Sequence, residues 1–219
     1  MVNTSAMTTK TLTYLFDPLC GWCYGASPAI QQLGQHAAIR LELLPTGLFA
    51  GAGGRTLDAQ FADYAWSNDT SIEKLTGQRF SEDYRTQVLG QHGSRFDSAT
   101  TTLALTAVAL TAPQRELETL KVLQEARYIH ALDTGSVPVV AQLLRDMGLN
   151  AAADRLAAGD AELLAANAAR IAKAQALMQT FGAQGVPALV LTDDNGSRLL
   201  RGNALYGSFD VLLSHIAAA

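Results

Sequence analysis

The pattern of apolar and polar residues predicts two strands near the start of the chain. Residues 11–16 (TLTYLF) are rich in β-branched and aromatic side chains, which is typical of a buried strand. Residues 39–44 alternate between apolar and polar positions, which indicates a second strand. A helix is expected between them over 21–37, with a kink at Pro28 because proline removes a backbone donor.

Strand patterns return at the end of the chain. Residues 188–192 (ALVLT) predict a third strand, and 198–201 predict a fourth. The sequence DDNG at 193–196 is a signal for the turn of a hairpin that joins them. A closing helix is expected over 209–217.

The middle of the chain, residues 57–181, has helical spacing instead. Asp160 suits the N-cap of its longest helix, and Gly182 suits the C-terminal cap. One face of that helix is predicted to carry Leu164, Ala168, Ile171, Ala174, Met178 and Phe181. Shorter helices are expected over 98–110, 114–129 and 137–147, the last with Ser136 as N-cap and Pro138 in its first turn.

Composition and charge exclude several classes of protein. Of the 219 residues 48% are apolar, so the chain can bury a sizeable core. The net charge is −4 and no basic run is present, which argues against a nucleic acid or a membrane surface as partner. Residues 1–9 are expected to be disordered. No signal peptide or transmembrane stretch is visible, so the expected location is cytoplasmic.

The chain has two cysteines, Cys20 and Cys23. Two thiols three positions apart cannot make the disulfide framework of a small secreted protein. A structural zinc site needs four ligands, and the four histidines are scattered along the chain. No metal site is therefore expected.

The sequence Cys20-Gly21-Trp22-Cys23 lies between the first predicted strand and the helix that follows it. The N-terminus of a helix carries a partial positive charge, which stabilises a thiolate. Cys20 would then be the attacking thiol, and Cys23 would resolve the mixed disulfide. The alternative is that both cysteines are small core residues. The strand–CxxC–helix context favours redox chemistry.

A second candidate feature is Gly185-Val186-Pro187, just before the third predicted strand. Proline at this place commonly starts a strand. A cis peptide bond is the alternative, since cis bonds in folded proteins are mostly found before proline. The local sequence alone favours the strand start.

These features together resemble the DsbA family of thioredoxin-like thiol–disulfide oxidoreductases. The segment 16–25 (FDPLCGWCYG) is similar to a proteobacterial branch whose members are labelled protein-disulfide isomerases or FrnE-like oxidoreductases. The resemblance implies an α/β thioredoxin-like fold with a large all-helical insertion between a βαβ half and a C-terminal ββα half. The thioredoxin-like domain is expected over 11–56 and 183–219, and the insertion over 57–182.

The resemblance also implies roles for individual residues. Cys20 would be the nucleophile and Cys23 the resolving thiol, with Pro187 as a cis proline packed against the pair. The backbone of Val186 would pair with an extended substrate peptide, and Trp22 is expected at an apolar rim. The implied substrates are protein or peptide thiols and disulfides. No bound cofactor is implied beyond the redox-active disulfide, with glutathione as a candidate co-substrate.

This chain departs from the exported oxidants of the family. No histidine lies between the cysteines, no export signal is visible, and the second cysteine pair of some FrnE-like proteins is missing. These departures favour reduction or reshuffling of disulfides, or a detoxifying thiol enzyme, over disulfide formation.

Several other residues have two interpretations. Asp17 could influence the thiols, but a strand-ending turn residue is the simpler interpretation. Arg127 and Arg201 could bind an anion such as a glutathione carboxylate, with solvated charges as the default interpretation. The glycine-rich segment 46–55 could be a mobile loop that lines the cleft.

Two other functions stay open at this point. Kappa-class glutathione transferases and hydroxychromene-carboxylate isomerases resemble a thioredoxin fold with a helical insertion, but they use a serine where Cys20 stands. A non-catalytic chaperone would use the cleft around Pro187 without redox turnover. Fold likeness alone does not choose among these functions. Substituting Cys20 by serine separates them, because exchange needs the thiol and chaperoning does not.

Overall fold

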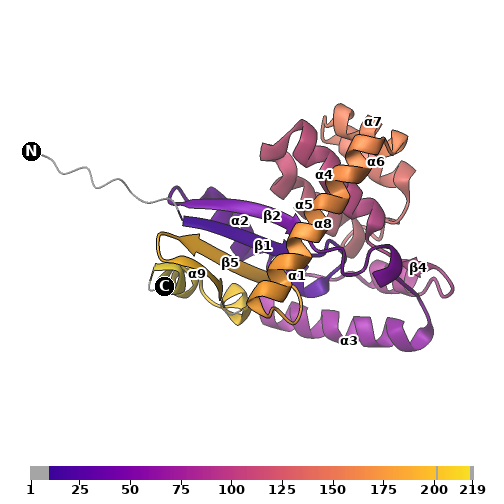
Figure 1. Ribbon diagram of the computed structural model, residues 1–219. Helices are drawn as coiled ribbons and strands as arrows, with labels where there is room; N and C mark the ends of the chain where they lie inside the picture. The colour runs from indigo at the N-terminus through magenta and orange to yellow at the C-terminus, as the bar shows by residue number, and fades with distance from the viewer. Residues whose placement is uncertain (1–9, 201, 218–219) are drawn as a thin grey trace, which may run out of the picture.

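The computed structural model describes residues 10–200 and 202–217, so the expected disorder of 1–9 and the role of Arg201 lie outside the described residues. Its main sheet has four strands in the order β2-β1-β5-β6 (Figure 1). The central strand β1 pairs parallel with β2 and antiparallel with β5, and β5 forms a hairpin with β6. The bounds are β1 Lys10–Phe16, β2 Ile39–Pro45, β5 Ala188–Asp193 and β6 Gly196–Leu200.

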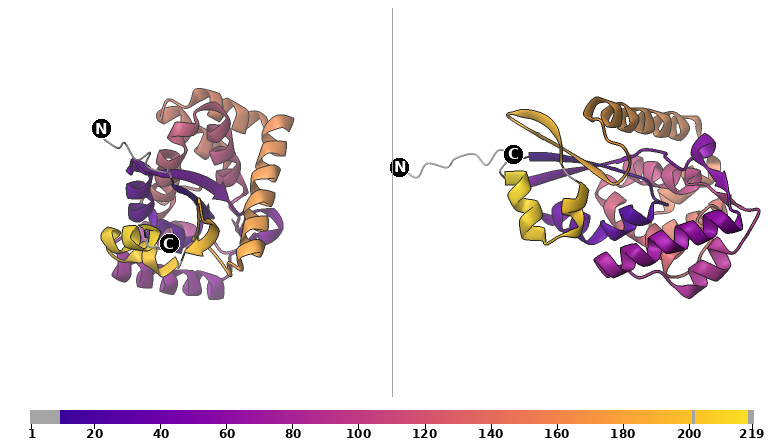
Figure 2. Two further views of the ribbon diagram at one scale, coloured as in Figure 1. Left: turned by 60° about the vertical axis from the view of Figure 1, so that its left-hand side comes forward. Right: turned by 90° about the horizontal axis from the view of Figure 1, so that it is seen from below.

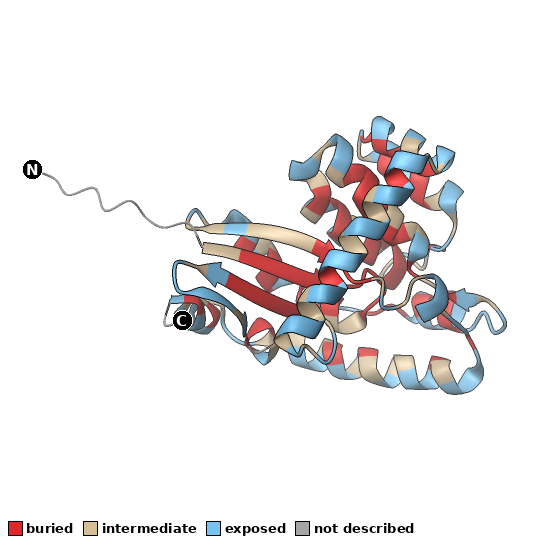
Figure 3. Ribbon diagram, in the orientation of Figure 1, coloured by how far each residue is buried: buried red, intermediate tan, exposed pale blue. Residues whose placement is uncertain are grey.

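The two faces of the sheet are covered by different helices (Figure 2). Because side chains alternate along a strand, Leu12, Tyr14 and Phe16 share one face of β1. They pack in the core beneath α1 (Gly21–Gly25), α2 (Ser27–Gln35) and α9 (Phe209–Ala217). Leu15 points to the other face and packs with residues of α8 (Ala161–Phe181). Both central strands are consequently buried, as Figure 3 shows.

The expected kinked helix over 21–37 is two helices. The first ends at Gly25, and Ala26 separates it from the second. Pro28 lies in the first turn of α2, where the missing backbone donor costs nothing because first-turn N–H groups have no partner within the helix. Proline therefore starts a new helix here instead of kinking a continuous one.

The regular structure between β2 and β5 is mostly helical. It contains a short ribbon of β3 (Arg55–Thr56) and β4 (Arg95–Phe96) and one π-helical turn, η2 (Tyr84–Leu89). Three further short turns are η1 (Gly51–Gly53), η3 (Pro113–Arg115) and, after β6, η4 (Gly202–Tyr206). The remaining helices are α3 (Ala59–Thr76), α4 (Ala99–Thr111), α5 (Glu116–Tyr128), α6 (Val137–Asp146) and α7 (Asn150–Ala158). The sequence pattern predicted no individual helix for α3 or for α7, only helical spacing over 57–181.

The longest helix, α8, begins and ends where the sequence predicts. The Asp160 side chain accepts a hydrogen bond from the backbone N–H of Leu163, and Gly182 has the left-handed conformation of a helix cap. The predicted apolar face is wrong in its first half, since Leu164 is 52% exposed and Ala168 is also exposed. Leu163 is buried instead, in the core cluster that includes residues of α4 and α7.

Arg170 connects α8 to the sheet. Its guanidinium donates a 2.8 Å hydrogen bond to the backbone oxygen of Leu43 in β2, and it pairs with the buried carboxylate of Glu116 in α5. The helical segment is thus attached to the sheet edge by a buried polar contact as well as by apolar packing. Within the described ranges, no helix combines the length and hydropathy required to cross a bilayer.

Candidate active site

Both cysteines are buried, and Cys20 keeps slight exposure. Cys20 is the N-cap residue of α1 and is 8% exposed, whereas Cys23 lies inside the helix and is fully buried. The two residues are 3.5 Å apart, and both are free thiols. A thiol at a helix start with access to solvent is placed to attack, and a buried thiol one turn later is placed to resolve.

The structure brings Val186 and Pro187 to the cysteine pair. The Val186–Pro187 peptide bond is cis, as the family resemblance implied. The Cys20 thiol lies 3.6 Å from the backbone oxygen of Val186, although 166 residues separate them in the sequence. These two segments meet because β1 and β5 are neighbouring strands of the sheet.

Aromatic residues of the sheet half surround the pair. The Tyr14 hydroxyl donates to the backbone oxygen of Cys23, and the Tyr206 hydroxyl donates to that of Trp22 at 3.2 Å. Trp22 itself is half-buried and packs edge-on against Tyr206. Burial raises the pKa of the Cys23 thiol well above its usual range, with further contributions from Cys20. Cys23 is therefore protonated at neutral pH.

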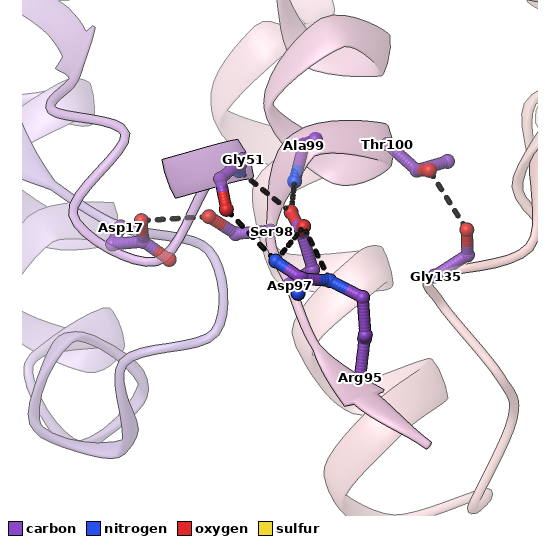
Figure 4. Close-up of polar contacts among 8 residues, drawn as sticks. All are labelled: Asp17, Gly51, Arg95, Asp97, Ser98, Ala99, Thr100 and Gly135. Atoms are coloured by element: carbon purple, nitrogen blue, oxygen red, sulfur yellow. Dashed lines mark hydrogen bonds and ion pairs between the residues drawn. The ribbon is translucent and has the colours of Figure 1, made fainter. Parts of the chain in front are cut away.

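Asp17 is a buried anchor, and this goes beyond the turn interpretation. Its carboxylate is fully buried and accepts hydrogen bonds from Leu19 N (2.9 Å), Phe49 N (3.0 Å) and Ser98 Oγ (2.8 Å). Burial raises the pKa of Asp17, and the three hydrogen bonds oppose that shift. Figure 4 shows its contact with Ser98 at the start of α4. Asp17 thus joins three segments directly behind the cysteine pair.

The segment 46–55 is held to the same place. Besides the bond from Phe49 to Asp17, Gly51 N donates to Asp97 at 3.0 Å, and Arg95 donates to the backbone oxygen of Gly51 at 2.8 Å (Figure 4). Asp97 also accepts from Ala99 N at the start of α4. These contacts attach the loop that the sequence suggested as mobile.

A second aromatic group approaches the pair from the helical segment. The Tyr128 hydroxyl of α5 donates a buried 2.8 Å hydrogen bond to the backbone oxygen of Leu19, just before Cys20. Tyr24 is buried and stacks on Tyr128 with ring centroids 4.8 Å apart. The helical segment therefore fixes the backbone on the N-terminal side of the attacking thiol.

Comparison with known families gives a match over residues 11–216, to the DSBA-like thioredoxin domain. This chain belongs to that family. It has the thioredoxin-like DsbA fold expected from the sequence, and it is a DsbA-like disulfide oxidoreductase. The comparison of this sequence with curated proteins returned no match.

Solved structures of the DsbA-like family are similar over nearly the whole chain. The cytosolic disulfide reductase DsbM from Pseudomonas aeruginosa is 29% identical with a TM-score of 0.83, covering 95% of this chain and 100% of DsbM. A DsbM structure with GSH is 28% identical with a TM-score of 0.82, covering 95% of this chain and 98% of that one. A Nitrosomonas europaea protein is 20% identical with a TM-score of 0.80, covering 96% and 97%, and shows the shared fold alone.

In this DsbA-like domain a buried carboxylate also lies against the redox motif, and the sequence analysis missed it. Asp69 of α3 is 5% exposed, and its Oδ2 accepts a 3.1 Å hydrogen bond from the Tyr84 hydroxyl. Burial raises the pKa of Asp69 to about 7. A signal existed, because Asp69 lies seven residues after Ala62 and three before Ile72, which puts all three on the buried side of α3.

Arg127 is buried, so its default interpretation as a solvated charge is wrong. It is 5% exposed, and its guanidinium lies over the rings of Phe96 and Tyr84 at 5.1 and 5.6 Å. It lines a cavity of about 440 Å³ together with Asp97 and Asp133. In the described part of the chain, its Nε and Nη2 atoms have no hydrogen-bond partner.

Proposed function

We propose that this chain reduces disulfides of protein or peptide substrates through Cys20 and Cys23, with glutathione as the co-substrate that restores the dithiol. The observation that carries the proposal is the placement of Cys20 at the start of α1, where it keeps 8% exposure, with a fully buried Cys23 only 3.5 Å away. The reducing direction is supported by the likeness to DsbM, a cytosolic disulfide reductase with a structure containing GSH.

The reaction has two exchange steps. The Cys20 thiolate attacks one sulfur of the substrate disulfide, so that bond breaks and the departing thiolate takes up a proton. The Cys23 thiol then loses its proton and attacks the Cys20 sulfur, which forms the Cys20–Cys23 disulfide and releases the second substrate thiol. The substrate gains two electrons, and the cysteine pair loses them.

Glutathione closes the cycle. One glutathione thiolate attacks the Cys20–Cys23 disulfide and forms a mixed disulfide with Cys20. A second glutathione attacks that mixed disulfide, so oxidised glutathione leaves and the dithiol returns. Two glutathione molecules thereby supply the two electrons that the substrate received.

Residues 186–187 and Trp22 are proposed to hold the substrate. The backbone oxygen of Val186 lies beside the Cys20 sulfur, where the N–H of an extended peptide could pair with it. Pro187 follows directly in the cis form, and the half-buried Trp22 ring offers an apolar contact from the same motif as Cys20. We propose no nucleic-acid or membrane partner, and a cytosolic location by analogy with DsbM.

The test is the redox equilibrium of the purified protein with glutathione, with Cys20→Ser and Cys23→Ser as variants. The wild type is expected to form a reversible disulfide with a potential near the thioredoxin value of about −270 mV. Cys23→Ser should accumulate a mixed disulfide with one glutathione, and Cys20→Ser should show no exchange.

Two results would overturn the proposal. A potential near about −120 mV would indicate an oxidant instead of a reductase. Failure of the wild type to form a reversible disulfide would exclude exchange and leave a glutathione-dependent transferase or isomerase as the function to test.

A further inference from the structure

The carboxyl group of Asp69 touches the redox motif at its glycine. A Cβ atom placed on Gly21 would lie 2.4 Å from Asp69 Oδ1 and 3.1 Å from Ile72 Cδ1, and the first distance is far inside van der Waals contact. Glycine at the position after Cys20 therefore makes room for a carboxyl group that comes from α3. The contact joins residues 48 positions apart, and it depends on the missing side chain of Gly21 as well as on the carboxyl group of Asp69.

Charged and titratable groups surround Asp69 from every element packed on it. Tyr84 of η2 donates its hydroxyl to Oδ2, and Arg127 of α5 lowers the pKa of Asp69 by its charge. Burial raises the pKa of the Tyr128 hydroxyl in α5, and the charges of Tyr84, Asp69 and Cys20 raise it further. Asp69 and Cys20 thus share one buried electrostatic environment on the insertion side of the motif.

We propose that Asp69 is a positioning residue for the cysteine pair, in which a carboxyl group held against Gly21 controls the stability of the Cys20 thiolate. The proposal rests on the proposed disulfide exchange through Cys20 and Cys23. It assigns to the helical insertion a direct influence on the redox equilibrium, in addition to its packing role.

Electrostatic repulsion decides in which direction Asp69 shifts the redox equilibrium of the cysteine pair. An ionised Asp69 repels a thiolate at Cys20 and so makes that thiolate less stable, whereas a protonated Asp69 does not. A less stable thiolate makes the dithiol a stronger reductant, since oxidants such as DsbA owe their potential to a stabilised reduced form. Because burial raises the pKa of Asp69 to about 7, this influence changes within the neutral pH range.

The first test compares Asp69→Asn with Asp63→Asn. Asparagine keeps an oxygen for the Tyr84 hydroxyl and removes the charge, and Asp63 is an exposed residue of the same helix that loses the same charge. We expect Asp69→Asn to shift the glutathione equilibrium toward the dithiol by roughly tenfold at pH 8, which corresponds to a potential about 30 mV less negative. The Cys20 thiolate, followed by its absorbance, should form at lower pH.

Asp63→Asn should leave both quantities unchanged. Equal effects of the two substitutions would overturn the proposal, because they would show only the change in net charge. The wild-type disulfide remains measurable in this experiment, so a failure of Asp69 is distinguishable from a failure of the proposed function.

A second measurement needs no variant. Linkage is reciprocal, so a carboxyl group that disfavours the thiolate must itself bind its proton more tightly when the thiolate is present. Carbon-13 NMR of the Asp69 carboxyl should give a higher pKa in the dithiol form than in the disulfide form. The same pKa in both forms would overturn the proposal, even if Asp69→Asn failed to fold.

Discussion

The two sides of the cysteine pair are built from different chemistry. On the sheet side, Tyr14, Tyr206 and the Val186 backbone contact the pair, and none of these groups is charged at neutral pH. On the insertion side, Tyr128 fixes the preceding backbone, and the carboxyl of Asp69 lies against Gly21. The sheet half also supplies the buried carboxylate of Asp17, whose charge adds to burial in raising the pKa of Cys23, whereas the carboxyl of Asp69 meets the motif at Gly21.

This difference shows how the redox equilibrium of a cysteine pair can be changed within one thioredoxin-like fold. The position of Val186 beside Cys20 follows from strand pairing, which a change in redox chemistry would leave intact. Buried charges act strongly because the protein interior screens them less than water does. A change on α3 can thus alter the redox equilibrium without moving the sheet.

The largest expected effect on stability comes from removing the Asp69 charge. Burial raises its folded-state pKa from 3.8 to about 7, so the folded state binds a proton more tightly than the unfolded state. The stability of the wild type should therefore fall as the pH rises from about 4 to 7. We expect Asp69→Asn to be more stable than the wild type by at most roughly 4 kcal/mol at pH 8, with little difference at pH 4.

Urea unfolding at a series of pH values measures this effect. Asp63→Asn is the control and should follow the wild-type pH dependence. Parallel curves for Asp69→Asn and wild type would show that Asp69 carries no unfavourable charge in the folded state.

The second largest effect is expected from removing the Asp17 carboxylate, which connects the sheet half to the start of α4. Asp17→Ala removes the acceptor for three buried or half-buried donors, from Leu19, Phe49 and Ser98. We expect a loss of about 3 kcal/mol in the free energy of unfolding, because buried donors without partners keep their desolvation cost. Ser98→Ala removes one of these bonds and should cost about 1 kcal/mol. Similar losses for the two variants would mean that the other two bonds contribute little.

Two tyrosine-to-phenylalanine substitutions compare the insertion side of the cysteine pair with its sheet side. Tyr128→Phe removes a fully buried 2.8 Å hydrogen bond, and Tyr206→Phe removes a 3.2 Å bond from a half-buried hydroxyl. We expect a loss of about 1.5 kcal/mol for Tyr128→Phe and about 0.5 kcal/mol for Tyr206→Phe. Thermal unfolding measures both, and the reverse order would contradict the idea that the insertion fixes the backbone at Leu19.

The smallest effect is expected for an exposed ion pair within the insertion. Arg145 and Asp154 lie 3.1 Å apart with largely exposed side chains. Arg145→Ala should change the free energy of unfolding by less than about 0.5 kcal/mol, since water and salt screen such pairs. A larger loss would point to a packing role for the arginine stem.

Much of the fold could be predicted because it depends on local patterns. The buried strand before Cys20, the hairpin at residues 193–196 and the caps of α8 all follow from neighbouring residues, and the structure confirms them. The division of the first helix at Ala26 was missed because proline suits both a kink and a helix start. Helices α3 and α7 were not predicted individually, because helical spacing over 57–181 does not by itself mark where each helix begins and ends.

The sequence by itself determined the strand–CxxC–helix motif, and with it the candidate chemistry of Cys20 and Cys23. Only the tertiary structure decided what surrounds that motif. The contact of Asp17 with Ser98 spans 81 residues, and the contact of Asp69 with Gly21 depends on how α3 packs on α1. Burial and long-range electrostatics arise from packing between distant segments, so a linear pattern reports the charge of Asp69 or Arg127 but not its environment.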